Sequence, residues 1–137
     1  MKKRLLLATC VVTLCYLAST AAASAHPLGN FTINRFSRIE VAGHRIYVSY
    51  VLDMAEIPTF QAGHIDARAY ANRLARGVQL TVNGKPAVLV AGATALAHPM
   101  GAAGLHTTRL EVLLLGPPVG GSTEIAYHDT NYSDRIG

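Results

Sequence analysis

The sequence has no tryptophan and only two cysteines, and both cysteines lie within its first 25 residues, at Cys10 and Cys15. Residues 26–137 therefore offer neither a disulfide nor a thiolate ligand for a metal. The sequence also lacks a Gly-x-Ser-x-Gly elbow, a P-loop, a dinucleotide-binding glycine motif and a His-Glu-x-x-His metal motif. With no cysteine nucleophile and no catalytic motif, we expect that the protein is not an enzyme and has no catalytic residues.

Positive charge is scarce once the first four residues are set apart. The formal net charge is +4, and Lys2, Lys3 and Arg4 supply three of these charges. Without them the chain has nine basic and eight acidic residues. So small a surplus gives no basic patch for an anionic polymer, and we expect no nucleic-acid partner.

The first 25 residues have the three parts of an export signal. The basic residues at positions 2–4 precede a mostly apolar run over residues 5–18, and Ala23-Ser24-Ala25 has the small-x-small pattern that signal peptidase recognises. The apolar run is shorter than the stretch of about 20 apolar residues that a transmembrane anchor needs. The alternative to a cleaved signal is that this segment stays on the protein as an uncleaved anchor. The pattern predicts a signal peptide over residues 1–25, a mature chain that begins at His26, and a place in the periplasm or on the extracytoplasmic face of the cytoplasmic membrane.

Apolar and polar residues alternate over several short stretches, which is typical of strands with one buried face. Asn83-Gly84 separates two of these stretches and is a strong hairpin signal, because both residues tolerate a positive φ. Pro58 ends another, since proline has no N–H for a strand ladder. Strands are predicted over residues 31–41, 45–53, 78–82, 87–90, 107–115 and 122–128.

One helix is predicted, over residues 65–76, where apolar residues recur at helical spacing and Gly77 follows as a stop. The alanine- and glycine-rich residues 91–104 predict a loop, and residues 116–121 predict a turn. Six strands and one helix indicate a mainly β domain over residues 26–137, a small antiparallel β-sandwich (Ig-like) with one short helix. The predicted core consists of Val48, Tyr50, Leu52, Leu80, Val88, Leu110, Val112 and Ile125.

A histidine at a freed amino terminus offers two nitrogen ligands from one residue. The α-amine and imidazole of His26 can chelate Cu(II) or Ni(II), and one further ligand would extend the set. Pro27 removes the second backbone amide as a ligand. The alternative is that His26 only marks the cleavage point. The other histidines show neither zinc-finger nor helical i, i+4 spacing, so only folding could bring one of them close: His44, His64, His98, His106 and His128.

Three segments of the chain, in this order and behind a signal, are distinctive. They are His26-Pro27-Leu28-Gly29-Asn30-Phe31-Thr32-Ile33-Asn34, then Tyr50-Val51-Leu52-Asp53-Met54-Ala55-Glu56-Ile57-Pro58-Thr59-Phe60, then Asn131-Tyr132-Ser133-Asp134-Arg135-Ile136-Gly137. Together they resemble the extracytoplasmic N-terminal region of bacterial nickel/cobalt transporters of the NicO type. The resemblance implies a β-rich domain that is displayed outside the membrane and joined to a polytopic permease for Ni(II) or Co(II).

The resemblance implies an accessory domain, because the intramembrane histidines and acids that would carry the ion are absent. We expect it to act in metal handling or permease contact, with a divalent metal ion and a membrane permease, in the same chain or a separate one, as partners. The candidate metal ligands are His26 with His128 and Asp129, which adjoin the third segment, or with Asp53 and Glu56 from the second. The alternatives are that Asp53 and Glu56 cap a turn or meet an arginine, and that the protein is a free periplasmic copper- or nickel-binding β-sandwich.

Overall fold

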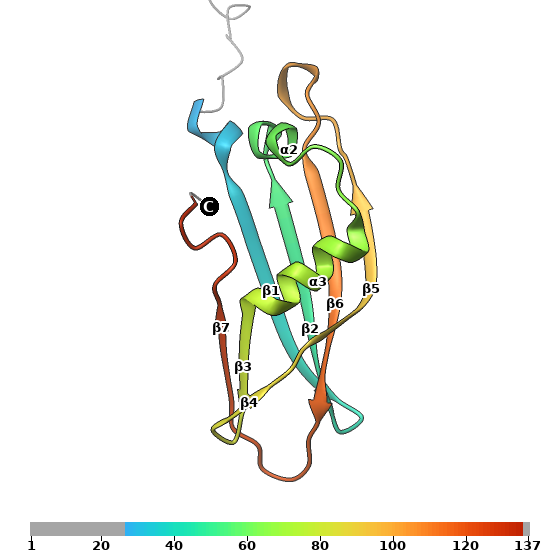
Figure 1. Ribbon diagram of the computed structural model, residues 1–137, viewed down its shortest axis with the longest axis vertical. Coiled ribbons are helices and arrows are strands. Elements are labelled where there is room, and N and C mark those ends of the chain that lie inside the picture. Colours follow the sequence, from blue (N-terminus) through green and yellow to red (C-terminus); the bar gives the residue numbers. More distant parts are fainter. Residues whose placement is uncertain (1–26, 136–137) are drawn as a thin grey trace, which may run out of the picture.

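The computed structural model describes residues 27–135 of the 137-residue chain. Seven strands form two antiparallel sheets, one of four strands in the order β1-β2-β6-β5 and one of three in the order β4-β3-β7 (Figure 1). The strands are β1 (Ile33–Ala42), β2 (Arg45–Met54), β3 (Val78–Val82), β4 (Lys85–Ala87), β5 (Val90–Ala97), β6 (Thr108–Pro118) and β7 (Ile125–Asp129). The helices are η1 (Pro27–Phe31), α2 (Glu56–Ala62), α3 (Ala67–Gly77) and η2 (Ala102–Gly104).

The core lies between the larger sheet and a second layer made of α3 and the smaller sheet. Helix α3 crosses one face of the larger sheet, and the three-stranded sheet continues from its end (Figure 1). Buried residues of the two layers form one hydrophobic cluster. The mainly β, two-sheet fold that the sequence predicts is therefore confirmed, in the form of a small sandwich with a helix as part of one layer.

Strand β2 shows why the larger sheet has one core face. Every second residue is buried, from Ile46 through Val48, Tyr50 and Leu52 to Met54. The alternation matches the two-residue period of a strand, so one face of β2 meets the core. The neighbouring strand β6 buries Thr108, Leu110, Val112 and Leu114 in the same way.

Two tight turns are formed by residues that tolerate a positive φ. Asn83 and Gly84, at φ 49° and 74°, connect β3 to β4 as the sequence predicts. Gly43 and His44, at φ 54° and 62°, make the corresponding turn between β1 and β2. Positive φ at both residues of a two-residue turn matches the twist of the flanking strands.

The helix predicted over residues 65–76 is confirmed as α3, with small differences at both ends. The side chain of Asp66 accepts a hydrogen bond of 2.7 Å from the Ala69 N–H and so caps the first turn. Ala71 and Leu74 of the predicted apolar stripe are fully buried. The helix begins two residues later than predicted and includes Gly77.

The prediction of a loop over residues 91–104 is wrong for its first half, which forms β5 beside β6. Small residues are poor strand formers by propensity, but they suit a strand that packs beneath a helix. A Cβ at Gly92 would lie 3.0 Å from the Leu113 carbonyl oxygen, and Ala91 is buried in the core. Close packing of β5 against β6 at Gly92 and burial of Ala91 in the core therefore override the local propensity. Residues 98–107 remain a loop that contains η2.

Helix α2 is a second element that the sequence reading missed. Pro58 does lie beyond the end of β2, but it stands in the first turn of a helix, where its missing N–H has no intrahelical partner to lose. The side chain of Thr59 donates a hydrogen bond of 3.2 Å to the Met54 carbonyl and ties the helix to the strand before it. A proline two residues after Glu56 was the available signal for a helix start.

One predicted core residue is wrong and one is only partly right. Val88 is 79% exposed, and its neighbour Leu89 is buried instead. A shift of one residue reverses the side chain's direction in an extended segment, and the strand β4 ends at Ala87 rather than at residue 90. Ile125 is half-buried against the core. The predicted turn at residues 116–121 begins late, because β6 continues to Pro118.

We predict that Leu110→Asp unfolds the domain. Leu110 is fully buried in β6, and an unpaired buried charge costs several kcal/mol or so against a total stability of about 5–15 kcal/mol. Urea denaturation followed by circular dichroism would measure the loss. Glu111→Gln, at the adjacent exposed position, is the matched control and should shift the midpoint little. A cooperative transition retained at the wild-type midpoint in Leu110→Asp would contradict the assigned core.

Candidate functional site

The three distinctive segments meet at one end of the molecule. The backbone N–H of Ala55, in the second segment, donates a hydrogen bond of 3.0 Å to the carbonyl of Thr32, in the first. Ile33, Met54 and Tyr132, one from each segment, line a common hollow. Residues far apart in sequence are thus assembled into one surface, which we take as the candidate functional site. His26 lies outside the described residues.

Asp129 at the end of β7 connects the third segment to the larger sheet. The buried Tyr50 donates a hydrogen bond of 2.8 Å from its hydroxyl to Asp129 Oδ2. The Asn131 backbone N–H and side-chain amide each donate to Asp129 Oδ1 at 2.9 Å. Arg35 of β1 lies 3.8 Å from the same carboxylate. Asp129 therefore has a protein partner on each oxygen.

The third segment is held against α3 by Asn131. Its side-chain amide donates a hydrogen bond of 2.9 Å to the Leu74 carbonyl in the last turn of the helix. A Cβ at Gly77 would lie only 2.1 Å from Asn131 Oδ1, so the glycine makes room for this contact. The following residue, Tyr132, has a left-handed backbone at φ 51°, which turns the chain towards the hollow.

The hollow has a volume of about 240 Å³, and we call it the Tyr70–Tyr132 hollow. The hydroxyls of these two tyrosines are hydrogen-bonded to each other across it. Burial, followed by the Tyr70 hydrogen bond, raises the pKa of Tyr132, so its hydroxyl stays protonated at neutral pH. The lining residues are Ile33, Met54, Pro58, Gln61, Ala62, Tyr70, Arg73, Tyr132 and Arg135.

Arg73 is fixed in the wall of the hollow by aromatic rings. Its guanidinium carbon lies 3.8 Å from the centroid of the Tyr70 ring and 5.9 Å from that of Tyr132. It also donates a hydrogen bond of 2.7 Å to the Tyr132 hydroxyl. Within residues 27–135 no carboxylate lies within ion-pair distance of Arg73. The site therefore presents an oriented cation.

Glu56 organises the loop beside α2. Its Oε1 accepts a hydrogen bond of 2.6 Å from the Ala102 N–H, and the residue is buried. That bond, followed by one from its own backbone N–H, lowers the pKa of Glu56. A Cβ at Gly101 would lie 2.4 Å from the same oxygen, so a larger residue there would displace the carboxylate.

Four large apolar residues are exposed on segments at the same end of the molecule as the hollow, and we call them the apolar tip. Phe31 ends η1, Phe60 lies on α2, and Met100 and Leu105 lie on the loop between β5 and β6. Helix η1, helix α2 and the loop between β5 and β6 stand together at one end of the molecule (Figure 1). Phe60 is 80% exposed. A cluster of exposed apolar side chains marks an interaction surface in soluble proteins.

The remaining predicted metal ligands do not form one cluster within residues 27–135. Asp53 accepts hydrogen bonds of 2.9 and 3.1 Å from Arg109 on the outer face of the larger sheet. Glu56 faces the loop at Ala102, and Asp129 faces Tyr50. His128 is exposed on β7 opposite Gln79. Among residues 27–135 no three histidine, cysteine or acidic side chains lie close enough to hold a metal ion together.

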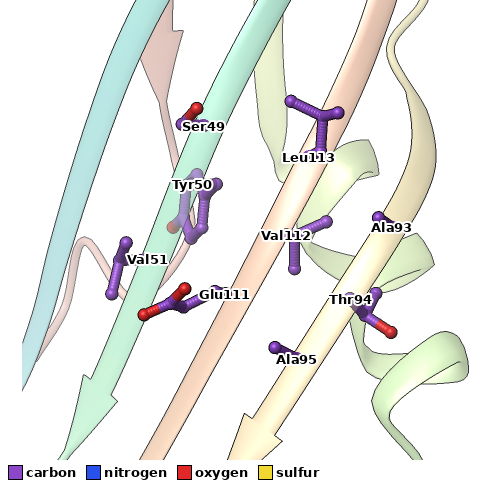
Figure 2. Close-up of a pocket in the computed structure, with 9 residues that line it drawn as sticks. All are labelled: Ser49, Tyr50, Val51, Ala93, Thr94, Ala95, Glu111, Val112 and Leu113. Atoms are coloured by element: carbon purple, nitrogen blue, oxygen red, sulfur yellow. The ribbon is translucent and has the colours of Figure 1, made fainter.

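A second hollow, of about 280 Å³, lies across β2, β6 and β5 (Figure 2). The side chains of Ala93 and Ala95 on β5 are small, which leaves the space open. Glu111 is the only charged residue that lines it, and its carboxylate pairs with Arg109 at 2.8 Å. Among the described residues, the second hollow therefore has no charged group without an oppositely charged partner. The Tyr70–Tyr132 hollow has one in Arg73, and we take it as the better candidate for binding a ligand.

Comparisons with protein-family models, curated proteins and solved structures found no match for this chain. In the part of the chain that the structure describes, no helix has the length and apolar character needed to cross a membrane. The functional assignment therefore rests on the residues and their arrangement.

Tyr70, Arg73 and Tyr132 are not among the site residues that the sequence predicts. In the helical pattern over residues 65–76, Tyr70 falls on the apolar stripe and Arg73 falls off it, which favours a core role for the tyrosine and an exposed position for the arginine. Only folding brings the third segment to α3, so spacing alone gave no signal for the pair of tyrosines. The one available hint was that Tyr132 belongs to a distinctive segment.

We predict that Glu56 contributes to acid sensitivity. Its folded pKa lies below the ordinary value of 4.5, so the unfolded chain binds the proton more readily. The contribution to stability is therefore complete above about pH 4.5 and disappears as the pH falls through the lowered pKa. Glu56→Gln should lose less stability than the wild type when urea midpoints are compared from pH 7 down to about pH 3. Glu124→Gln, whose carboxylate has no partner within residues 27–135, should keep the wild-type slope. Identical slopes for Glu56→Gln and the wild type would contradict this role.

A double-mutant cycle tests the contact between Gly77 and Asn131. Gly77→Ala alone should destabilise the domain by about 1–3 kcal/mol, because the new Cβ displaces Asn131 and leaves its hydrogen-bond partners unsatisfied. In an Asn131→Ala background the same change should be neutral or stabilising, since alanine is the better helix former by about 1 kcal/mol. Additive free energies of unfolding would show that the two residues do not interact.

Proposed function

We propose that residues 26–137 form the extracytoplasmic accessory domain of a nickel/cobalt transporter and act through contact with the permease. The observation that carries this proposal is the convergence of the three NicO-like segments on one end of the fold, around the Tyr70–Tyr132 hollow. If the three segments contributed only to core packing, we would not expect them to converge on one surface. Their convergence supports a shared binding role.

The exposed apolar tip supports contact with another protein. Its side chains come from three separate segments that Glu56 and the Ala55–Thr32 hydrogen bond hold together. Aromatic residues and methionine are enriched where protein surfaces meet. Asp53, Glu56 and Asp129 already have partners within the domain, as described above, so the contacts in the structure give them structural roles. Contact with the permease is thus the better supported of the two accessory roles.

The position of the third distinctive segment also supports contact with the permease. Arg135, near its end, lines the hollow together with Gln61 and Ala62 of α2. In the family that the chain resembles, this is the segment that leads towards the membrane helices. A permease joined there would lie beside α2 and the apolar tip. The divalent ion is then the cargo of the permease, and the domain acts on the protein that carries it.

The first experiment is to read the gene beyond the codon for Gly137. Apolar spans in the same frame, or a neighbouring gene for a polytopic protein, would support the accessory role. A stop codon with no such gene nearby would favour the alternative, a free periplasmic metal-binding protein that uses His26.

We predict that Phe60→Ser weakens the function of the transporter without destabilising the domain. Phe60 is 80% exposed, so its loss removes little core packing. The difference in cellular nickel and cobalt between cells with and without the transporter should shrink, whichever direction the ion moves. Val88→Ser is the matched control, because Val88 is 79% exposed and follows β4 near the other end of the molecule (Figure 1). Equal metal contents for the two variants would contradict a contact at the apolar tip.

Calorimetry on the trimmed protein tests the alternative. If the amine and imidazole of His26 bind Ni(II), Co(II) or Cu(II), one extra residue before His26 should weaken binding by blocking the amine. The affinity should also fall as the pH drops through about 6.5, where imidazole is protonated. Equal, tight binding by both proteins would rule out the terminal chelate, and absence of binding by either would leave permease contact as the remaining role.

A further inference from the structure

The charge of the Tyr70–Tyr132 hollow is unbalanced. Arg73 and Arg135 both line it, and none of the residues that line it is acidic. Arg135 Nε lies 3.8 Å from Asp134 Oδ2, and both side chains are largely exposed. An exposed pair of this kind is worth at most about 1 kcal/mol, so Arg135 can exchange Asp134 for another carboxylate. The hollow therefore has positive charge available to a ligand.

Arg73 differs from the other arginines near this end in how it is held. Arg109 and Arg35 each face a carboxylate, whereas Arg73 is stacked on Tyr70 and donates to the Tyr132 hydroxyl. A guanidinium has five N–H donors, and the Tyr132 bond uses one. The remaining donors are oriented by two aromatic rings before any ligand arrives, which lowers the entropic cost of binding a carboxylate.

The size and walls of the hollow select for a single side chain. Its volume of about 240 Å³ is below the range of about 300–1,000 Å³ that is typical of small-molecule sites. Ile33, Met54 and Pro58 supply apolar wall, and Phe60 of the apolar tip follows Pro58 on the same helix. A ligand that fits has a carboxylate for the arginines and apolar groups beside it.

We infer that the Tyr70–Tyr132 hollow binds the carboxylate side chain of an acidic peptide segment that is flanked by apolar residues. The carboxylate pairs with Arg73 and Arg135, and the flanking residues contact the hollow's apolar wall and the apolar tip. Assignment of that segment to an extracytoplasmic loop of the permease rests on the function proposed above. The recognition itself rests only on charge complementarity, size and the fixed position of Arg73.

Titration with two short peptides tests the inference. The probes are acetyl-Leu-Glu-Leu-amide and the uncharged acetyl-Leu-Gln-Leu-amide, added to the isotope-labelled exported protein and followed by NMR. The glutamate peptide should shift the amide resonances of Gln61, Ala62 and Tyr132, and it should bind at least about tenfold more tightly than the glutamine peptide, since a charge-assisted pair is worth about 1.4 kcal/mol or more. Its affinity should fall with added salt.

Three variants separate recognition from folding. Arg73→Gln should abolish the preference for the glutamate peptide, and Arg73→Lys should keep part of it, because lysine retains the charge without the planar fork. Arg76→Gln is the matched control, since Arg76 is on the same helix and does not line the hollow. The spectrum of each free variant shows whether the fold is kept.

Equal affinity for both peptides, resonance shifts away from the hollow, or no binding at about 10 mM peptide would each overturn the inference. Binding to phosphatidylcholine vesicles through the same residues, with neither peptide recognised, would overturn it as well. These outcomes are distinct from those for the proposed function. A stop codon after Gly137 would leave a positive titration intact, and a failed titration would leave the gene's downstream sequence to decide the transporter role.

Discussion

The hydrogen bond from Tyr50 to Asp129 joins the two sheets, and the arrangement of the site depends on it. Tyr50 lies in the middle of β2, and its side chain is almost completely buried. A buried hydroxyl needs a partner, and Asp129 is the residue that provides it from the other sheet. Burial, followed by the bond to Asp129, raises the pKa of Tyr50 well above its usual range. The phenol therefore remains a hydrogen-bond donor at neutral pH.

Asp129 connects this buried hydrogen bond to residues at the surface of the hollow. Its other oxygen orients Asn131, which binds the end of α3, and the next residue is Tyr132 with its left-handed backbone. A tyrosine at a positive φ is held there by its surroundings rather than by its own preference. Tyr132 in turn fixes Arg73. Arg73 is thus positioned through a chain of contacts that starts in the core.

The sequence could predict what local pattern determines. The alternation in β2, the Asn83-Gly84 turn and the apolar stripe of α3 each leave a direct signal, and each is confirmed. Strand β5 and helix α2 were missed because packing decides them. A small residue in β5 allows close packing against β6, and Pro58, which ends a strand pattern, stands in the first turn of a helix. Val88 was assigned to the core because an irregular link between strands shifts the alternation by one residue.

The site was harder to predict because it is built from distant residues. The structure brings the three distinctive segments together, although they are far apart in the sequence. The roles of individual residues within them did not follow from residue type: Asp53, Glu56 and Asp129 suggest metal ligands in the sequence, yet each is engaged by a neighbour in the fold. No rule of spacing connects Tyr70 to Tyr132, since 62 positions separate them.

The link between β2 and β7 also sets the order in which the domain can be completed during synthesis. Tyr50 and Asp129 are 79 positions apart, and β3 pairs with β7 rather than with an earlier strand of the larger sheet. The β1–β2 hairpin can form as soon as it emerges, but the smaller sheet lacks a strand until β7 appears. Long-range pairing of this kind is slow and leaves strand edges unpaired in the meantime. The core of the domain therefore stays open until β7, the last strand of the described residues, has been synthesised.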